Sequence, residues 1–300
     1  MNRSLFAAAA GVALLVLVFS SCASGMSRAD LAAEYFNIGN AFLDLDQPDR
    51  ASEYFVRALD LDPDLRVAEF NLARAYMNAN RYIEARGVLE DLLEIDPDNT
   101  IVLKAYGYVL YQQGSSREAE DVFGQVVMIN PSDVDAWFNR ALIARQRGDL
   151  EEADSFIGRA RELDRTASDV SRLYALVQYE TGTPNARELL EEVHAAQPDD
   201  LEILEALARS AFTDGDYAVA RDLADDLVNR DPAEAGYRFL QARVAFIGLE
   251  DTDLGVVALR QALERDFQDV EALNELLEQV DSEIRDLVEA LMIDFGFEGE

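Results

Sequence analysis

The chain has little of several residue types that catalytic and metal sites need. Its 300 residues include one cysteine, Cys22, and one histidine, His194. A single cysteine cannot form a disulfide within the chain, and one cysteine with one histidine cannot make a zinc cluster. The sequence has no GxxxxGK phosphate loop, and its acidic run LDLDPD lacks the glycine and the closing glutamate of a calcium loop. We therefore predict no catalytic residue, no metal ion and no cofactor, and we expect His194 to be an ordinary packing or surface residue.

Positive charge is also scarce. Only 26 residues are basic, and Lys104 is the one lysine among them, whereas 59 residues are acidic and the formal net charge is −33. A surface this acidic repels nucleic-acid phosphates and anionic lipid head groups over about 10 Å at 0.1 M salt. We predict that nucleic acid is not a partner. The acidic excess either keeps an elongated surface in solution or attracts a basic partner, and the sequence leaves both open.

The N-terminal apolar run is short for a membrane-spanning helix. Leu5–Phe19 is 15 residues long, whereas about 20 are needed to cross the hydrocarbon layer. Arg3 precedes the run and two small serines follow it, which is typical of a secretory signal peptide over residues 1–21. An uncleaved signal anchor is the alternative.

The segment FSSC, which ends at Cys22, resembles the lipobox of bacterial lipoproteins. In that family the cysteine after two small residues is acylated and becomes the new N-terminus. The resemblance implies lipidation of Cys22, a short tether over residues 22–31, and anchoring in the outer or cytoplasmic membrane of a bacterial cell envelope, on the periplasmic side. Phe19 departs from the family, which usually has leucine or another aliphatic residue there. An ordinary signal peptide that happens to end near a cysteine is the alternative.

From residue 32 onward, small, aromatic and proline positions recur with a period of 34 residues. The first unit has Tyr35, Ile38, Gly39, Phe42, Ala51, Phe55, Ala58 and Pro63 at these positions, and the third has Tyr106, Gly107, Leu110, Ala119, Phe123 and Pro131. This pattern resembles the tetratricopeptide repeat (TPR). The small residues, such as Gly39 and Gly107, are expected where two helices of a hairpin cross closely.

The resemblance implies an all-α fold, a right-handed superhelical solenoid of about seven helix-turn-helix repeats with C-terminal capping helices. The expected repeats are 32–65, 66–99, 100–133, 134–167, 168–200, 201–234 and 235–269, and residues 270–300 form a partial repeat and capping helix. Three units depart from the pattern. The fourth has Arg165 in place of proline, the fifth is one residue short in its turn, and the seventh holds one extra residue before its second helix.

In the TPR family, the first helix of each hairpin lines a concave groove. The register places a series of basic and aromatic or long apolar residues there: Phe70, Arg74, Met77, Lys104, Tyr108, Tyr111, Phe138, Leu142, Arg145, Arg172, Tyr179, Arg209, Phe212, Phe239, Arg243 and Phe246. Arginine and aromatic side chains suit the capture of an extended or helical peptide segment. Alternatively, these arginines pair with acidic residues of the same register, and the aromatic rings only complete the packing. The acidic residues are Asp135, Asp169, Glu202 and Glu205.

Some TPR domains bind C-terminal carboxylates through asparagine and lysine side chains. Asn40 and Asn71 occupy two such positions, but Phe36 and Ile101 stand where lysine is needed. We therefore do not expect this clamp. The resemblance implies a scaffold or adaptor that binds other proteins or peptide segments and is not an enzyme, and a homo-oligomer is left open. The alternative is an accessory ligand-binding or transporter-associated TPR lipoprotein.

Overall fold

The computed structural model describes residues 26–297. The predicted signal peptide, Cys22 and the start of the tether lie outside these residues. Within them, the regular elements are sixteen α-helices and one short π-helix, which confirms the all-α fold. No helix of this range combines the length and the apolar character that a membrane span requires.

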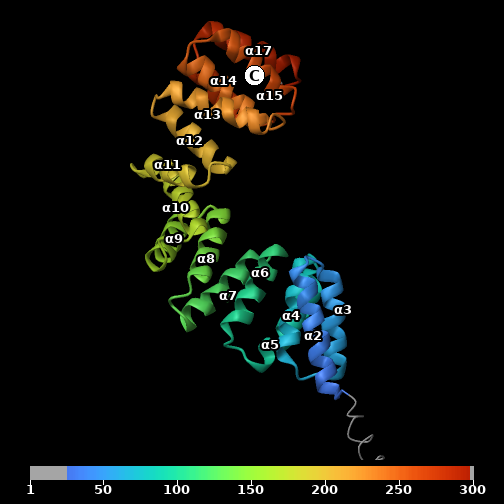
Figure 1. Ribbon diagram of the computed structural model, residues 1–300. Helices are drawn as coiled ribbons and strands as arrows, with labels where there is room; N and C mark the ends of the chain where they lie inside the picture. The colour runs from blue at the N-terminus through green and yellow to red at the C-terminus, as the bar shows by residue number, and fades with distance from the viewer. Residues whose placement is uncertain (1–25, 298–300) are drawn as a thin grey trace, which may run out of the picture. The chain divides into compact units, whose positions relative to one another are not determined.

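Contacts divide the chain into two units, residues 1–139 and 140–300. In the N-terminal unit, each helix between Arg28 and Ile129 packs against the next (Figure 1). The helices of this unit are α2 (Arg28–Asp44), α3 (Pro48–Leu61), α4 (Arg66–Asn78), α5 (Tyr82–Ile95), α6 (Thr100–Gln112), α7 (Ser116–Ile129) and the first part of α8 (Val134–Arg147).

The C-terminal unit continues the same antiparallel pairing. It contains the rest of α8, α9 (Leu150–Leu163), α10 (Ser168–Glu180), α11 (Ala186–Ala196), α12 (Leu201–Thr213), α13 (Tyr217–Arg230), α14 (Ala235–Arg243), the π-helix η1 (Val244–Gly248), α15 (Thr252–Leu263), α16 (Val270–Gln279) and α17 (Ser282–Asp294). The even-numbered helices from α4 to α16 begin at residues 66, 100, 134, 168, 201, 235 and 270. The first helix of the first repeat, α2, begins at Arg28, four residues before residue 32, where that repeat was expected to begin.

Glycines mark the close crossing of the two helices in a hairpin, as expected. A methyl group on Gly39 would lie 2.5 Å from Cε1 of Phe55, and one on Gly107 would lie 2.9 Å from Cζ of Phe123. Both rings are buried, with exposed fractions of 0% and 1%. Real Cβ atoms do not approach a ring this closely, so the absent side chain on one helix makes room for the ring on the other.

The loops between hairpins depend on an aspartate or asparagine side chain. The carboxylate of Asp62, Asp164 and Asp231, and the amide oxygen of Asn130, each accept a hydrogen bond from the backbone N–H two residues later. Such a bond forms a turn without proline. This explains why the loop at Asp164 has the same length as the others although Arg165 replaces the expected proline.

The fifth hairpin shows where its missing residue is accommodated. In the third hairpin, the N–H of Ala119 donates to the carbonyl of Ser115, four residues back, whereas the N–H of Ala186 donates to the carbonyl of Thr183, three residues back. Helix α11 therefore starts late and has 11 residues, whereas α7 has 14. The expectation of a shorter turn was wrong, because the deletion tightens the start of the second helix and shortens it.

The seventh hairpin contains its extra residue within the first helix. After α14 the chain continues as the five-residue π-helix η1, in which Leu249 N–H donates to the carbonyl of Val244. A π-turn closes over five residues, so it takes up one inserted residue without breaking the helix. The insertion thus precedes the second helix, α15, as the sequence indicated.

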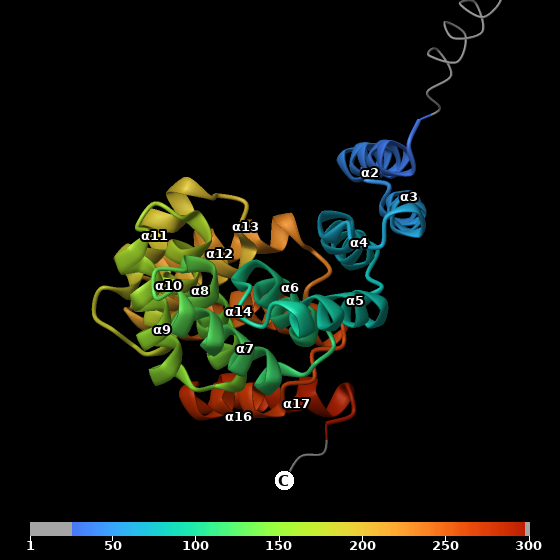
Figure 2. The ribbon, with the colours of Figure 1, turned by 90° about the horizontal axis from the view of Figure 1, so that it is seen from below.

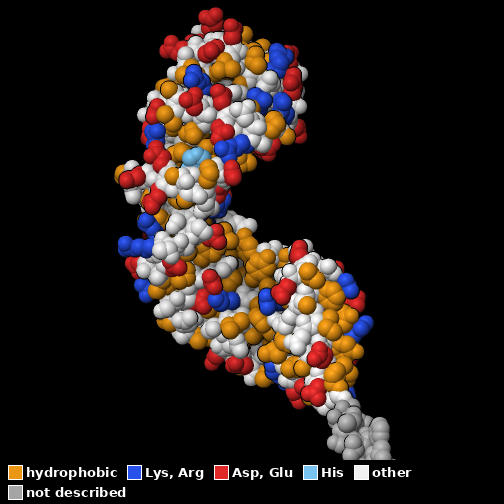
Figure 3. All heavy atoms as spheres, in the orientation of Figure 1, with side chains coloured by type: hydrophobic (Ala, Val, Ile, Leu, Met, Phe, Trp, Pro, Cys, Tyr) orange, Lys and Arg blue, Asp and Glu red, His pale blue; other side chains and the backbone are white. Residues whose placement is uncertain are grey.

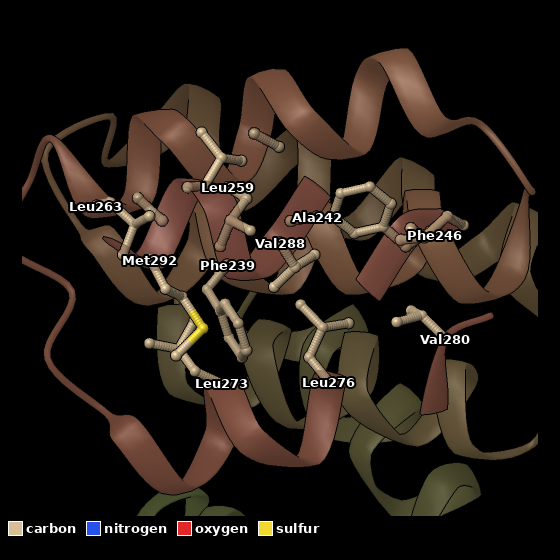
Figure 4. Close-up of a cluster of buried hydrophobic side chains, with 14 residues drawn as sticks. Phe239, Ala242, Phe246, Leu259, Leu263, Leu273, Leu276, Val280, Val288 and Met292 are labelled. Atoms are coloured by element: carbon tan, nitrogen blue, oxygen red, sulfur yellow. The ribbon is translucent and has the colours of Figure 1, made fainter. Parts of the chain in front are cut away.

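The last two helices, α16 and α17, lie at the end of the C-terminal unit (Figure 2), where they cover a cluster of buried apolar side chains. Phe239, Ala242 and Phe246 lie opposite Leu276 and Val288 in one buried cluster, which Figure 4 shows in close-up. Phe239 also stacks on Phe267, with ring centroids 4.3 Å apart. Helices α16 and α17 therefore bury side chains that α14, η1 and α15 cannot bury alone.

Candidate functional site

The expected groove residues lie on the first helices of the hairpins, and we call the side chains they expose the first-helix face. In the N-terminal unit this face includes exposed Arg74, half-buried Phe70 and Tyr111, and Tyr108, which is 39% exposed. Phe138, on α8, is also half-buried. Apolar and basic side chains on these helices are therefore open to solvent to different degrees.

Two exposed aliphatic residues extend this face on α4 and α6. Val67 is 56% exposed and Ile101 is 61% exposed. The Tyr108 ring lies edge-on to Tyr82, with centroids 6.5 Å apart, and burial raises the pKa of the Tyr108 hydroxyl. The first-helix face of the N-terminal unit is thus partly apolar although the chain as a whole is strongly acidic.

Lys104 is held within its own unit. Its Nζ lies 2.7 Å from Oδ2 of Asp135 and 3.2 Å from Oδ2 of Asp133. Burial alone would lower the pKa of the Lys104 ammonium group, but hydrogen bonds to these two carboxylates outweigh it and raise the pKa. The ion pair between Lys104 and Asp135 joins α6 to the start of α8. Such pairing of a basic groove residue with Asp135 was the alternative to peptide binding.

The two clamp-like asparagines bond to each other. Nδ2 of Asn71 donates to Oδ1 of Asn40 at 2.9 Å, and Arg74 Nη1 donates to Oδ1 of Asn71 at 3.1 Å. Each amide therefore has a partner within the chain.

In the C-terminal unit, Arg145 and Arg172 belong to an ionic network that spans three first helices. Arg145 Nη2 lies 2.7 Å from Glu180 Oε1 and 2.6 Å from Glu202 Oε1. Arg172 pairs with Glu202 and with Asp200, which caps α12. Hydrogen bonding to Glu180 is the largest effect that raises the pKa of Arg145. The network ties α8 to α10 and α12, so these two arginines are largely committed to internal partners.

Arg209 and Arg243 differ in their partners. Arg209 Nη2 lies 2.8 Å from Oε1 of Glu205 on its own helix. Arg243 extends over the ring of Phe212, 5.1 Å from the centroid, and its Nη2 donates to Gln279 Oε1 at 3.3 Å. The Nε of Arg243 is buried and has no acceptor. Burial, followed by the charge of Arg209, lowers the pKa of the Arg243 guanidinium.

Tyr179 lies among these charges. It is half-buried on α10, and burial is the main cause that raises the pKa of its hydroxyl, with opposing contributions from Arg209 and Glu205. The charged and aromatic groups expected on α10, α12 and α14 are thus brought close together.

Two expected groove residues are not on the face. Phe239 and Phe246 are only 2% and 3% exposed, and both belong to the buried cluster under α16 and α17. Assigning them to the groove was wrong, because the terminal helices cover this part of α14 and η1. The sequence reasoning also missed Glu180 and Asp200, which lie outside the expected groove positions.

His194 is half-buried on α11 and is visible as the pale blue side chain in Figure 3. In residues 26–297, no group of His, Cys, Asp or Glu side chains is arranged to hold a metal ion. Figure 3 also shows acidic and basic side chains interspersed with apolar ones on the visible surface of each unit.

Lowering the pH is expected to weaken the wild type more than the R172Q variant. Burial alone would raise the pKa of Asp200, but hydrogen bonds from Arg172 and from the Ile203 N–H outweigh it, so the folded-state pKa is lowered. The stabilisation is therefore present above the unfolded pKa of about 4 and is lost as the pH falls through the folded-state value. We expect the difference in unfolding free energy between wild type and R172Q to be constant from about pH 7 to 5 and to shrink below about pH 4.

Denaturant unfolding at each pH measures this difference. R159Q is the control, because the one ion pair that Arg159 forms within residues 26–297 is with exposed Glu162 on α9. A difference for R172Q that does not change with pH would contradict the prediction.

Comparison with known proteins agrees with the hairpin geometry. Models described as "Tetratricopeptide repeat" match residues 42–107, 105–156, 181–235 and 205–250. Together the matches cover more than half of the chain. The chain belongs to the tetratricopeptide repeat family. TPR domains bind proteins and peptides, so this chain is a protein–protein interaction scaffold of a generally non-catalytic family.

Solved TPR structures share the fold. A tetratricopeptide repeat protein from Parabacteroides merdae is 15% identical, with 86% of this chain and 98% of that chain covered and a TM-score of 0.59. PilF of Pseudomonas aeruginosa is 22% identical over 72% of this chain and 98% of its own, with a TM-score of 0.63. PilW, a type IV pilus biogenesis factor, is 20% identical over 71% of this chain and 99% of its own, with a TM-score of 0.58. No curated protein matches the sequence significantly.

Proposed function

We propose that this TPR protein is an adaptor that holds a segment of a partner protein on its first-helix face. The observation that carries the proposal is the exposure of Val67, Ile101 and Tyr108 on consecutive first helices. Exposed apolar side chains that cluster on one face are typical of binding sites. Tyrosine also provides a large contact area with few rotatable bonds to immobilise.

The adaptor is further proposed to work in a bacterial cell envelope, anchored by a lipid on Cys22. The signal-like leader and the FSSC segment support this location. The solved structure of PilW, a protein described as a type IV pilus biogenesis factor, has the same fold. Assembly of an envelope structure is the kind of process that an anchored adaptor would serve.

Replacing Tyr108 with alanine is expected to weaken partner capture at least about tenfold. A central aromatic side chain of an interface commonly contributes more than 1.4 kcal/mol, which is a tenfold change in affinity. Cross-linking in intact cells, followed by affinity capture of the tagged chain and mass spectrometry, measures the partner recovered. Circular dichroism checks that the helix content is unchanged.

Ile83→Ala is the matched control for this experiment. Ile83 is also apolar and is 81% exposed, but it lies on the second helix α5. Its loss should leave capture unchanged. Equal capture by Y108A and wild type would contradict binding at this face, and capture of no protein at all would favour the accessory ligand-binding alternative.

Replacing Cys22 with serine is expected to move the protein from the membrane fraction to the soluble fraction. Serine keeps the size of the side chain but lacks the thiol that carries the lipid. Fractionation with immunoblotting measures the distribution, and intact-mass spectrometry of the wild type should show the added acyl groups. An unchanged membrane fraction for C22S would point to an uncleaved signal anchor.

A further inference from the structure

Arg243 is the arginine of the first-helix face whose hydrogen-bonding capacity is least satisfied. Its Nε is buried without an acceptor, and Nη2 has only a long bond, 3.3 Å, to the neutral amide oxygen of Gln279. Within residues 26–297, no aspartate or glutamate forms a salt bridge with Arg243. A buried donor without an acceptor is unfavourable for folding, so such groups are rare in native proteins unless a ligand completes them.

The other arginines of this face in the C-terminal unit show what Arg243 lacks. Arg145, Arg172 and Arg209 each lie within 3 Å of at least one carboxylate oxygen. Arg243 instead lies over the ring of Phe212 and is close enough to Arg209 for the two charges to repel. Glu275 on α16 provides an opposing charge, which attracts Arg243 without forming a salt bridge with it. In a chain with a net charge of −33, this end of the face thus carries positive charge that no salt bridge within residues 26–297 neutralises.

We propose that Arg243, supported by Arg209, forms a subsite that accepts one carboxylate of the bound partner segment. This inference rests on the proposed function and specifies the chemistry of the segment that binds. The Nε–H and the Nη2–H lie on the same edge of the guanidinium, and Nε is buried in the unbound chain. When a carboxylate displaces Gln279 from this edge, it can accept two parallel hydrogen bonds from them. Gln279 would give up its long bond, and its amide would be free to donate to the same carboxylate.

A single carboxylate fits this site better than a more highly charged anion. Of the two guanidinium groups at this site, Arg243 alone has no salt-bridged carboxylate within residues 26–297, because Arg209 is already paired with Glu205. Phosphate groups and anionic membranes would also meet the repulsion of the acidic surface around the site. The carboxylate can be an acidic side chain or the C-terminus of the partner, since both offer the same pair of oxygens.

Peptide selection by the full chain tests the subsite. The immobilised protein is offered two randomised peptide pools of identical composition, one with free C-terminal carboxylates and one with C-terminal amides. We expect the wild type to enrich peptides that carry a carboxylate. In R243Q the enrichment of these peptides should fall at least tenfold, while apolar peptides are still retained. Enrichment only from the free-carboxylate pool identifies the C-terminus as the ligand, and enrichment of acidic residues in both pools identifies the side chain.

Two further variants keep the result interpretable. Q279E places a permanent carboxylate beside Arg243, so it should also abolish the acidic preference and should raise the melting temperature at pH 7. The increase should be absent in the R243Q/Q279E double variant. R221Q is the matched control, because Arg221 pairs with its neighbour Asp222 on the second helix α13, and it should select the same peptides as wild type.

The outcomes separate this subsite from the proposed function. Retention of peptides without a preference for carboxylates, or an unchanged preference in R243Q and Q279E, overturns the subsite and leaves peptide binding in place. Failure of the wild type to retain any peptide overturns both.

Discussion

Ending the chain after Gln268, which removes α16 and α17, is expected to unfold α14 and α15. The deletion removes Leu273, Leu276 and Val288, each with an exposed fraction of 0%. Burial of a side chain of this size contributes about 1.5–3 kcal/mol. In a stack of repeats each hairpin is stabilised mainly by its neighbours, so the loss falls on the adjacent pair.

Hydrogen exchange measured by mass spectrometry detects this loss. We expect protection of the α14 and α15 amides to fall at least about 100-fold, which corresponds to roughly 3 kcal/mol of local stability. The control ends after Phe297, which packs against the cluster, and should keep wild-type protection. An equal loss of protection in α2 and α3 would contradict the nearest-neighbour explanation.

Replacing Phe55 with alanine is expected to lower the unfolding free energy by about 3–5 kcal/mol. The ring is completely buried, lies against the gap left by Gly39, and packs with Phe36 at a centroid distance of 5.9 Å. Removing it leaves a cavity between α2 and α3 that these helices can close only partly. Denaturant unfolding followed by circular dichroism gives the change, and Val56→Ala, at an exposed position of the same helix, should change it by less than about 0.5 kcal/mol.

A double-mutant cycle tests the contact between Gly39 and Phe55 directly. In the wild type, G39A forces a methyl group into the ring and should destabilise the protein by about 1–3 kcal/mol. In the F55A background the methyl group meets no ring, and alanine is the better helix former by about 0.5–1 kcal/mol. G39A should then be neutral or stabilising. Destabilisation by the same amount in both backgrounds would mean that Gly39 is needed for another reason.

The sequence predicts the helical hairpins well because their physical requirements are local. Glycine is needed at positions 39 and 107 because the ring of Phe55 or Phe123 on the neighbouring helix packs directly against it. Glycine suits position 114 for another reason, a φ of +80° in the turn that follows α6. The sequence did not indicate that Asp46 and Asn80 adopt the same left-handed backbone in the first two turns, at φ of 54° and 56°. Aspartate and asparagine tolerate this conformation, so glycine is not required.

The candidate site is less predictable because its contacts join distant residues. Helical register correctly placed Arg145 and Arg172 on the first helices, and Glu202 was expected as a partner. The register could not show that Glu180 would reach Arg145 from the next repeat, or that Asp200 would serve both as a helix cap and as the partner of Arg172. Nor could it show that Arg243 would lack a carboxylate, since this depends on which side chains α16 brings near it.

The π-helix after Arg243 sets the direction in which the following side chains point. A π-turn closes over five residues whereas an α-turn closes over four, so the side chains of η1 do not keep the directions that the α-helical period would give them. Phe246, which the regular period would direct to the first-helix face, points instead into the buried cluster beside Gly255, where an added methyl group would meet its ring at 2.4 Å. Arg243 is thus the last residue of α14 before the regular helical register is interrupted.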